Sequence, residues 1–234
     1  MTKKKRVAIF GSSSNPPTGK EGHLALVRKL AEDFDQVLVG PVYRHIYSTK
    51  HNLADYDDRL EMARRCFAGM PNVDVSDVEK RLFDEFERQD KKLDNGEREP
   101  VGTFDVLQHL RSLPENQDIE LTLALGGDTC KDLLEGKWKK SNEILALTKI
   151  VVFPRHGESL PQHDNFDIHI YDQAPTKGTS STKAREACET GNFDALAKIV
   201  EPSVLAYIRE KRLYTTMGMA DISASNEASR MSQL

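Results

Sequence analysis

The segment 7–23 has the sequence VAIFGSSSNPPTGKEGH, in which four apolar residues lead directly into a small, polar loop. Residues 7–10 are typical of a buried strand, because the apolar run is short and is ended by Gly, Ser and Pro residues. After the loop, Leu24, Val27 and Ala31 recur at helical spacing. This part of the chain therefore predicts a strand, a loop and a helix, in that order.

Strands and helices continue to alternate along the chain. We expect strands at 37–39 and 73–75, with a helix between them that carries Tyr56, Leu60 and Ala63 on one face. The same pattern then predicts a helix at 104–110, a strand at 121–125, helical segments between 129 and 146, and a strand at 150–153. Parallel strands need crossover helices, so this alternation favours an α/β fold. The expected architecture is a Rossmann-like, doubly wound, mostly parallel sheet with helices on both faces.

Length and composition exclude several classes of protein. The chain has 234 residues, of which 38% are hydrophobic and 30% are charged, which is typical of a globular protein. Its apolar runs are far shorter than the ~18 residues that a membrane-spanning helix needs, so we expect no membrane association. The formal net charge of −4 argues against a broad electrostatic surface for nucleic acid.

Cysteine usage and the amino terminus predict the compartment. Cys66, Cys130 and Cys188 are far apart in the sequence and have no zinc-binding spacing, which favours a reducing environment. Residues 1–6 are basic, but a strand-like segment follows them where a secretory signal would have a longer apolar stretch. We therefore expect a cytoplasmic protein, with a nuclear location left open.

Two stretches are predicted to lie outside the core. Residues 79–99 are dominated by charged side chains, which is typical of a solvated helix or a mobile insertion. From residue 217 onward the chain is rich in Ser, Ala, Asn and Met without helical or strand periodicity, which predicts a disordered tail. We expect a single domain over 1–215, with a charged insertion near 79–100 and a tail at 216–234.

The loop that follows the first strand is the first candidate for a ligand site. In doubly wound sheets, ligands bind at the carboxyl ends of strands near the point where strand order reverses. The loop is rich in small residues and ends in His23 at a helix start, a setting that suits phosphate. It is not a P-loop, because Ser14 and Glu21 stand where that motif requires Gly and Ser or Thr, and GxGxxG is absent.

A second candidate phosphate site lies near the carboxyl end. Residues 178–185 read GTSSTKAR and precede a helical segment. Hydroxyls at a helix start can cap its N–H groups or hold a phosphate, and Arg185 would lie about one turn into the helix. Taken singly, this segment favours an ordinary helix cap with a surface arginine, whereas the first loop favours the phosphate site and leaves a Ser/Pro turn with a surface histidine as the alternative.

Together, the two segments resemble the G-x-F-x-P-x-(H/T)-x-G-H and I-S-S-T-x-x-R motifs of the nucleotidylyltransferase superfamily, in the same order. Further similar stretches narrow the resemblance to the nicotinamide/nicotinate mononucleotide adenylyltransferases over about residues 5–215; they lie at 41–62, 102–107, 126–138, 152–155 and 204–214. The chain departs from the family pattern at four places. Thr18 stands at the position of the first histidine, Ser14 at that of the aromatic residue, and Gly102 at that of a tyrosine. Two extra residues lie between Thr18 and Gly22.

The resemblance implies transfer of the adenylyl group of ATP to nicotinamide or nicotinate mononucleotide, giving NAD or deamido-NAD and pyrophosphate. It implies Mg²⁺ bridging phosphate oxygens largely through water, with no metal-ligating residues assigned in the protein. The implied catalytic residues are His23, Arg185 and Lys50. The implied ATP-binding residues are Gly11, Ser12, Ser13, Thr18, Gly22, Ser180, Ser181 and Thr182. The implied mononucleotide-binding residues are Thr103, Asp128, Trp138 and Arg155.

Two alternatives stay open at the level of the sequence. One is another nucleotidylyltransferase, such as a pantetheine-phosphate adenylyltransferase. The other is a catalytically weak nucleotide-binding or scaffold protein, in which Ser14, Thr18 and the two-residue insertion have reduced turnover. The sequence fixes neither the preference between the amide and acid mononucleotides nor the oligomeric state, and a homo-oligomer is compatible with it.

Overall fold

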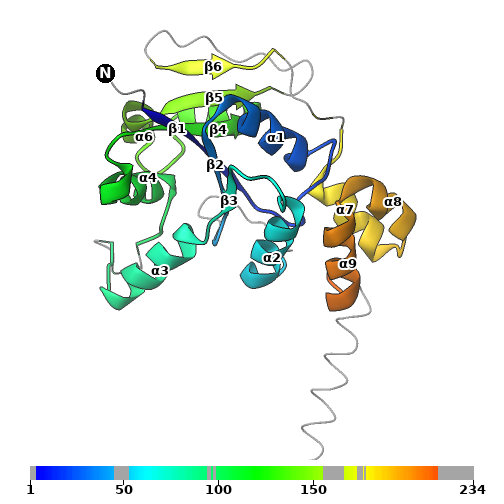
Figure 1. Cartoon of the computed structure of the whole chain (residues 1–234). Coiled ribbons are helices and arrows are strands. Elements are labelled where there is room, and N and C mark those ends of the chain that lie inside the picture. The colour runs from blue at the N-terminus through cyan, green and yellow to red at the C-terminus, as the bar shows by residue number, and fades with distance from the viewer. Residues whose placement is uncertain are drawn as a thin grey trace, which may run out of the picture. The chain divides into compact units, whose positions relative to one another are not determined.

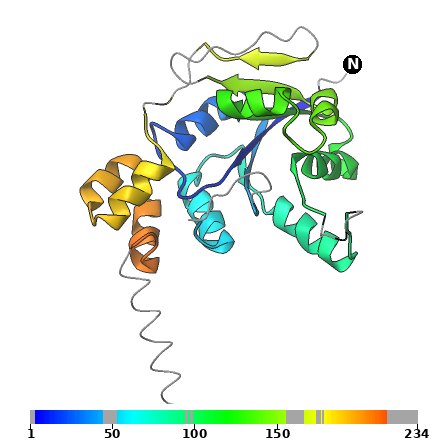
Figure 2. The ribbon, with the colours of Figure 1, turned by 180° about the vertical axis from the view of Figure 1, so that it is seen from behind.

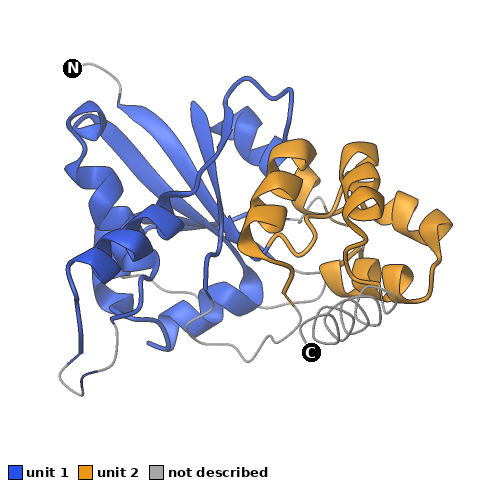
Figure 3. Cartoon of the chain, turned by 90° about the horizontal axis from the view of Figure 1, so that it is seen from below, with its two compact units in different colours: residues 1–13, 26–51, 67–175 blue, residues 14–25, 52–66, 176–234 orange. Residues whose placement is uncertain are grey.

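The computed structural model describes residues 4–44, 53–93, 96, 99–154, 166–172, 176 and 178–215. The chain forms two compact units, each assembled from three separate segments (Figure 3). Unit 1 contains residues 1–13, 26–51 and 67–175, and unit 2 contains residues 14–25, 52–66 and 176–234. The predicted tail at 216–234 lies outside the described residues, and the single-domain boundary at 215 stays a prediction.

Unit 1 is built on a six-stranded sheet with the order β3-β2-β1-β4-β5-β6 (Figure 1). All neighbouring strands are parallel, and Phe10 pairs with Val39 on one side and with Ala124 on the other. Strand order reverses between β1 and β4, which confirms the predicted doubly wound α/β architecture. The strands are β1 (Lys5–Ser12), β2 (Gln36–Pro41), β3 (Val73–Val75), β4 (Ile119–Gly126), β5 (Lys149–Phe153) and β6 (Ile168–Ile170).

Helices cover both faces of this sheet, as the alternation predicts (Figures 1 and 2). Alternate strand residues point to opposite faces. Ile9, Leu123 and Val152 belong to the main core cluster, which also contains apolar residues of the helices on that face. The helices of unit 1 are α1 (His23–Asp33), which begins in unit 2, α3 (Val78–Arg88), α4 (Thr103–Ser112), the 3-10 helix η1 (Pro114–Asn116), α5 (Gly127–Leu134) and α6 (Ser141–Leu147).

The charged segment at 79–99 differs from the prediction that it lies outside the core. Its first half forms α3, whose apolar residues Val78, Leu82 and Phe83 are buried in the main core cluster. Tyr43 packs against Phe83 with ring centroids 5.0 Å apart. The predicted helix is confirmed for this half, but its placement outside the core was wrong, because three apolar side chains at helical spacing suffice to bury one face, while Lys80 and its neighbours keep the other face solvated.

Strand β6 is the one strand of the described sheet that sequence patterning did not predict. It has only three residues, Ile168–Ile170, and two of them are exposed. An edge strand needs to bury few side chains, so it carries little of the apolar pattern by which strands are recognised.

Unit 2 is helical and encloses the loop at 14–22. Its remaining helices are α2 (Tyr56–Cys66), α7 (Ser181–Glu189), α8 (Phe193–Ile199) and α9 (Pro202–Lys211). The hydroxyl of Tyr207 donates to Asp58 Oδ1 at 2.8 Å, and the hydroxyl of Ser203 donates to the Arg65 carbonyl at 3.0 Å. These bonds join α9 to α2. No helix in the described part of the chain is long and apolar enough to cross a membrane.

Candidate active site

The loop that follows β1 is polar in sequence but buried in the structure. Ser14, Asn15 and Thr18 are 0%, 3% and 1% exposed. Buried polar groups must be paired, and Asn15 Oδ1 accepts hydrogen bonds from the Ala54 N–H at 3.0 Å and from the Tyr214 hydroxyl at 2.8 Å. The loop is therefore fixed by residues from two distant parts of the chain rather than by its own turn alone.

Thr18 and His23 hold each other in one arrangement. The Thr18 N–H donates to His23 Nδ1 at 3.1 Å, and the His23 N–H donates to Thr18 Oγ1 at 2.9 Å. The Thr18 hydroxyl also lies 2.8 Å from Nδ1. Because Nδ1 accepts a backbone N–H, it carries no proton, so the neutral ring has its proton on Nε2. The geometry presents His23 as a hydrogen-bond donor through Nε2.

Burial of the imidazole favours the same neutral state. Desolvation lowers the pKa of His23 from its ordinary value of 6.5 to about 4. The ring is therefore uncharged at neutral pH and can donate one proton in a hydrogen bond without titrating. Thr18, predicted to bind ATP, directs its hydroxyl at His23 and thus supports the histidine in this arrangement.

Gly22 is required for this arrangement by close packing. A Cβ atom at this position would overlap Thr18 Oγ1 and would lie 2.7 Å from Thr18 Cβ and 2.9 Å from Thr179 Oγ1. Real Cβ contacts are not this short, so any side chain would displace Thr18. The glycine that precedes the histidine in the motif therefore permits the Thr18–His23 pair.

The second predicted motif contacts the first within unit 2. Arg185 Nη1 donates to the Asn15 carbonyl at 2.8 Å, although the two residues are 170 positions apart in the sequence. The hydroxyl of Ser181 donates to the Pro16 carbonyl at 2.8 Å, and the hydroxyl of Thr179 donates to the Glu21 carbonyl at 2.7 Å. Three bonds thus join the residues around the start of α7 to the loop that precedes His23.

The start of α7 has the features of an anion site. Ser180 is the N-cap, and its hydroxyl accepts the Lys183 N–H at 3.2 Å. Arg185 Nη2 donates to Thr182 Oγ1 at 3.3 Å, so two of the five guanidinium N–H groups are used in orienting the side chain. The arrangement combines a helix N-terminus, hydroxyl groups and a forked cation, a set that suits phosphate oxygens.

The other predicted nucleotide-binding residues lie in unit 1 or outside the described residues. Gly11 and Ser12 end β1, and Ser13 follows them. A Cβ at Gly11 would meet no atom within 4 Å, so its glycine is not required by packing. Lys50 and Arg155 lie outside the described residues, and their predicted roles stay predictions.

The residues predicted to bind the mononucleotide are carried by the starts of helices and a loop of unit 1. Thr103 is the first residue of α4, and Asp128 is exposed in the first turn of α5. Trp138 lies between α5 and α6, where it packs partly buried against the main core cluster. The Trp138 N–H donates to Ser141 Oγ at 3.1 Å, which fixes the backbone beside the indole.

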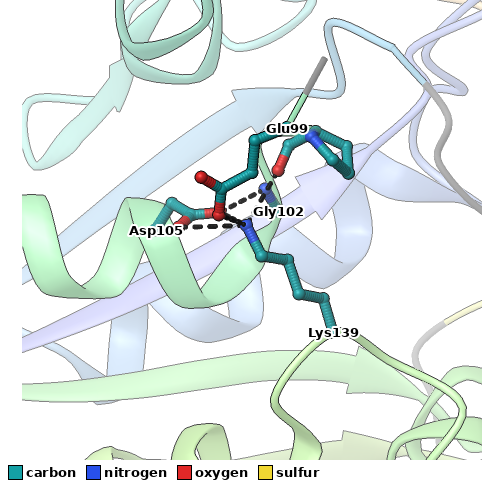
Figure 4. Close-up of polar contacts among 5 residues, drawn as sticks. Glu99, Gly102, Asp105 and Lys139 are labelled. Atoms are coloured by element: carbon teal, nitrogen blue, oxygen red, sulfur yellow. Dashed lines mark hydrogen bonds and ion pairs between the residues drawn. The ribbon is translucent and has the colours of Figure 1, made fainter. Parts of the chain in front are cut away.

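Two residues that sequence reasoning did not assign to the site hold parts of it in place. Asn15 binds Arg185 through its carbonyl and anchors the loop through its side chain. Lys139, next to Trp138, bridges Glu99 and Asp105 in unit 1 (Figure 4). Neither role has a periodic or motif signal, because each depends on partners that are brought close only by the fold.

Within the ranges that the structure describes, no three His, Cys, Asp or Glu side chains gather in a way that could hold a metal ion. Cys66, Cys130 and Cys188 are buried thiols.

Comparisons with known proteins place the chain in a family. The family model described as cytidylyltransferase-like matches residues 9–187. Among curated proteins, a probable nicotinate-nucleotide adenylyltransferase of Dehalococcoides mccartyi (strain ATCC BAA-2266 / KCTC 15142 / 195) is 28% identical over 220 residues, which are 89% of this chain and 97% of that protein. One of the same description from Halalkalibacterium halodurans is 29% identical over 215 residues, covering 91% and 92% of the two chains.

Solved structures have the same fold. A putative nicotinate-nucleotide adenylyltransferase from Vibrio parahaemolyticus matches with a TM-score of 0.61 at 23% identity, covering 90% of this chain and 95% of that chain. A Plasmodium falciparum nicotinic acid mononucleotide adenylyltransferase complexed with NaAD matches with a TM-score of 0.62 at 17% identity, covering 90% and 97%. The family model agrees with the shared fold and with the contacts that join the chain's two motif segments. The chain therefore belongs to the cytidylyltransferase-like family of nucleotidyltransferases.

Proposed function

We propose that this chain transfers the adenylyl group of ATP to the 5′-phosphate of nicotinate or nicotinamide mononucleotide, in the biosynthesis of NAD. A phosphate oxygen of the mononucleotide attacks the α-phosphorus, a new P–O bond forms, the α–β bridging bond breaks, and pyrophosphate leaves. No protein nucleophile is needed, so positioning and charge stabilisation supply the catalysis. The curated relatives, described as probable nicotinate-nucleotide adenylyltransferases, support a nicotinate nucleotide as the acceptor.

The observation that carries the proposal is the joining of His23 and Arg185 to one loop. Arg185 binds the Asn15 carbonyl, and His23 binds Thr18, three residues further along. In this account His23 Nε2 donates to the α- or β-phosphate, while Arg185 and the hydroxyls at the start of α7 bind the β- and γ-phosphates. These groups stabilise the charge that develops on the departing pyrophosphate.

The remaining predicted roles complete the account. Thr103 orients the amide or carboxylate of the pyridine ring, Trp138 stacks on that ring, and Asp128 lies near a ribose. Mg²⁺ bound to ATP would supply positive charge to the phosphates and, because it keeps several of its own waters, would require no dedicated protein cage. Gly11, Ser12 and Ser13 contribute backbone N–H groups, and Lys50 and Arg155 contribute positive charge.

The test is a pyrophosphate-release assay with ATP and Mg²⁺ in which the two mononucleotides are compared side by side. We expect turnover with at least one of them, and a loss of ~10²–10³ in rate for His23→Ala, the typical cost of removing one transition-state donor. His169→Ala, at an exposed histidine on β6, is the matched control and should keep the wild-type rate. Turnover with pantetheine phosphate in place of both mononucleotides, or nucleotide binding without turnover, would contradict the proposal.

A further inference from the structure

Two separate segments of unit 1 carry the residues assigned to the pyridine ring, and one lysine joins them. Lys139 follows Trp138 in the sequence, and its Nζ donates to Glu99 Oε1 at 2.8 Å and to the Pro100 carbonyl at 2.9 Å. The same Nζ lies 3.1 Å from Asp105 Oδ2, in the first turn of α4 (Figure 4). The Trp138 loop is thereby bonded to the chain on both sides of Thr103.

Asp105 connects this lysine to the start of α4. Its Oδ2 also accepts the Gly102 N–H at 2.8 Å, so one carboxylate holds both Lys139 and the residue that precedes Thr103 (Figure 4). If the Lys139 ammonium moves, the Asp105 carboxylate loses one of its two donors or moves with it, and its bond to the Gly102 N–H changes. The position of the Thr103 backbone is therefore set in part by a side chain from the Trp138 loop.

The backbone that carries Lys139 is itself well fixed. The Ser141 hydroxyl donates to the Trp138 carbonyl at 3.0 Å and accepts the Trp138 N–H. Lys140 has a left-handed φ of 58°, and its Nζ lies 4.2 Å from the centre of the Phe104 ring. Because this backbone is fixed, the bonds that hold Lys139 also restrict the position of the neighbouring Trp138 indole. A mobile backbone would let the indole move independently of Lys139.

The charges of the cluster make Lys139 hard to replace. Its side chain is 17% exposed and those of Glu99 and Asp105 are 29% and 11% exposed, so solvent screens the three charges only in part. Bonding to Lys139 holds the pKa of the Glu99 carboxyl below its ordinary value. Without the ammonium, two carboxylates would face each other in a partly desolvated space and would repel.

Lys137 provides a contrast on the same loop. It also pairs with two carboxylates, Asp132 at 2.8 Å and Glu135 at 2.7 Å, but its side chain is 58% exposed. Both partners belong to the end of α5 or directly follow it, so this cluster is local and joins no second segment.

We propose that Lys139 is a positioning residue for the mononucleotide: it holds the Thr103 and Trp138 segments at the separation that the pyridine ring requires. This inference rests on the proposed function, because it takes the ring to bind these two segments. It predicts an effect on mononucleotide affinity and little effect on ATP, whose β- and γ-phosphates are assigned to Arg185 and the hydroxyls at the start of α7, in unit 2.

The experiment compares wild type, Lys139→Met, Lys139→Arg and the control Lys137→Met. Trp138 is the only tryptophan, so fluorescence emission and its quenching by each mononucleotide report on this loop alone. We expect Lys139→Met to raise the mononucleotide Kd and KM about tenfold, within the range that a displacement of about 1 Å produces, while the KM for ATP changes less than twofold. Emission should shift to longer wavelength, Lys139→Arg should recover part of the affinity, and Lys137→Met should match wild type.

The inference is overturned if Lys139→Met keeps the wild-type emission and mononucleotide Kd, or if it raises the KM for both substrates equally. Should Lys139→Met fail to fold by circular dichroism, Glu99→Gln replaces it; we expect a smaller rise in mononucleotide Kd, and an unchanged Kd overturns the inference. If wild type itself neither turns over nor shows quenching, the proposed function fails instead. In that case the tryptophan emission wavelengths of Lys139→Met and Lys137→Met can still be compared. A shift to longer wavelength in Lys139→Met alone would show that Lys139 holds the Trp138 loop.

Discussion

Replacing Gly22 by alanine would place a methyl group in the space that Thr18 occupies. The new Cβ would overlap Thr18 Oγ1 and lie 2.7 Å from Thr18 Cβ. Thr18 is 1% exposed and is bonded to His23 through both its backbone and its hydroxyl, so it has little room to move outward. The expected result is a displaced Thr18 and a His23 ring that has lost its support.

Two contributions give the size of the effect. Overpacking a close-packed site costs about 1–3 kcal/mol. Loss of the Thr18–His23 hydrogen bonds adds about 1 kcal/mol for each bond that is not re-formed. With one bond lost the total is about 2–4 kcal/mol, and for a chain of this length each kcal/mol lowers Tm by about 2–4 °C, so we expect a decrease of roughly 4–16 °C in thermal unfolding.

The same variant should change the chemistry of His23. With Nδ1 released from Thr18 and the ring more exposed, the pKa of His23 should rise from about 4 toward 6.5, measured by following the imidazole proton signals by NMR. Turnover should fall by at least tenfold, since His23 is no longer positioned to donate.

Gly40→Ala is the matched control, because a Cβ at Gly40 meets no atom within 4 Å and its φ is not in the left-handed region. It should be neutral or slightly stabilising, by up to about 1 kcal/mol. A Gly22→Ala chain with the wild-type Tm, His23 pKa and turnover would refute the reasoning about the Thr18–His23 pair.

Three further predictions follow from the same geometry. Burial lowers the pKa of His23 to about 4, so between pH 6.5 and pH 4 the unfolded chain binds a proton that the folded chain excludes. In urea unfolding, the free energy of unfolding should therefore decrease as the pH is lowered, by up to about 2 kcal/mol at pH 5. His23→Asn should remove this pH dependence. Arg185→Lys keeps the charge but loses the fork that binds both the Asn15 carbonyl and Thr182. Pyrophosphate release should fall more than tenfold while Tm falls by only about 2–4 °C for the one bond that lysine does not re-form, and a wild-type rate would contradict this assignment. Tyr214→Phe removes the hydroxyl that donates to Asn15 Oδ1, so the free energy of unfolding should drop by about 1 kcal/mol, and an unchanged value would show that this bond does not hold the loop.

Most of the sheet was predictable from local pattern. Strands β1, β2, β4 and β5 are short apolar runs bounded by polar turns, and the burial of β1, β4 and β5 on both faces makes these strands stand out from the helices. Their boundaries extend beyond the predicted ones by one or two residues, because strand ends form ladder bonds without burying apolar side chains. The edge strand β6 was not predicted, because two of its three residues are exposed and it therefore lacks a run of buried apolar residues.

Helix α3 shows where a compositional argument fails. Charge dominates its sequence, yet Leu82 and Phe83 are buried because helical spacing gathers them with Val78 on one face. Averaging over the segment hides this face, whereas counting apolar residues at helical spacing would have revealed it.

The candidate site was predictable as two segments but not as a set of contacts. The motif order identified His23 and Arg185, and the structure joins their segments through Asn15 and Pro16. The supporting roles of Asn15 and Lys139 depend on partners up to 199 residues away, such as the Tyr214 that binds Asn15. Pairing over such separations leaves no local signal in a single sequence.

In the proposed reaction His23 and Arg185 act together on one triphosphate. We would measure the rate of pyrophosphate release from ATP and the preferred mononucleotide in His23→Ala, Arg185→Ala and the double variant. We expect a loss of ~10²–10³ for each single variant and a double loss well below their product, as for residues that act as a unit. A wild-type rate in either single variant, or two losses that multiply in full, would contradict it.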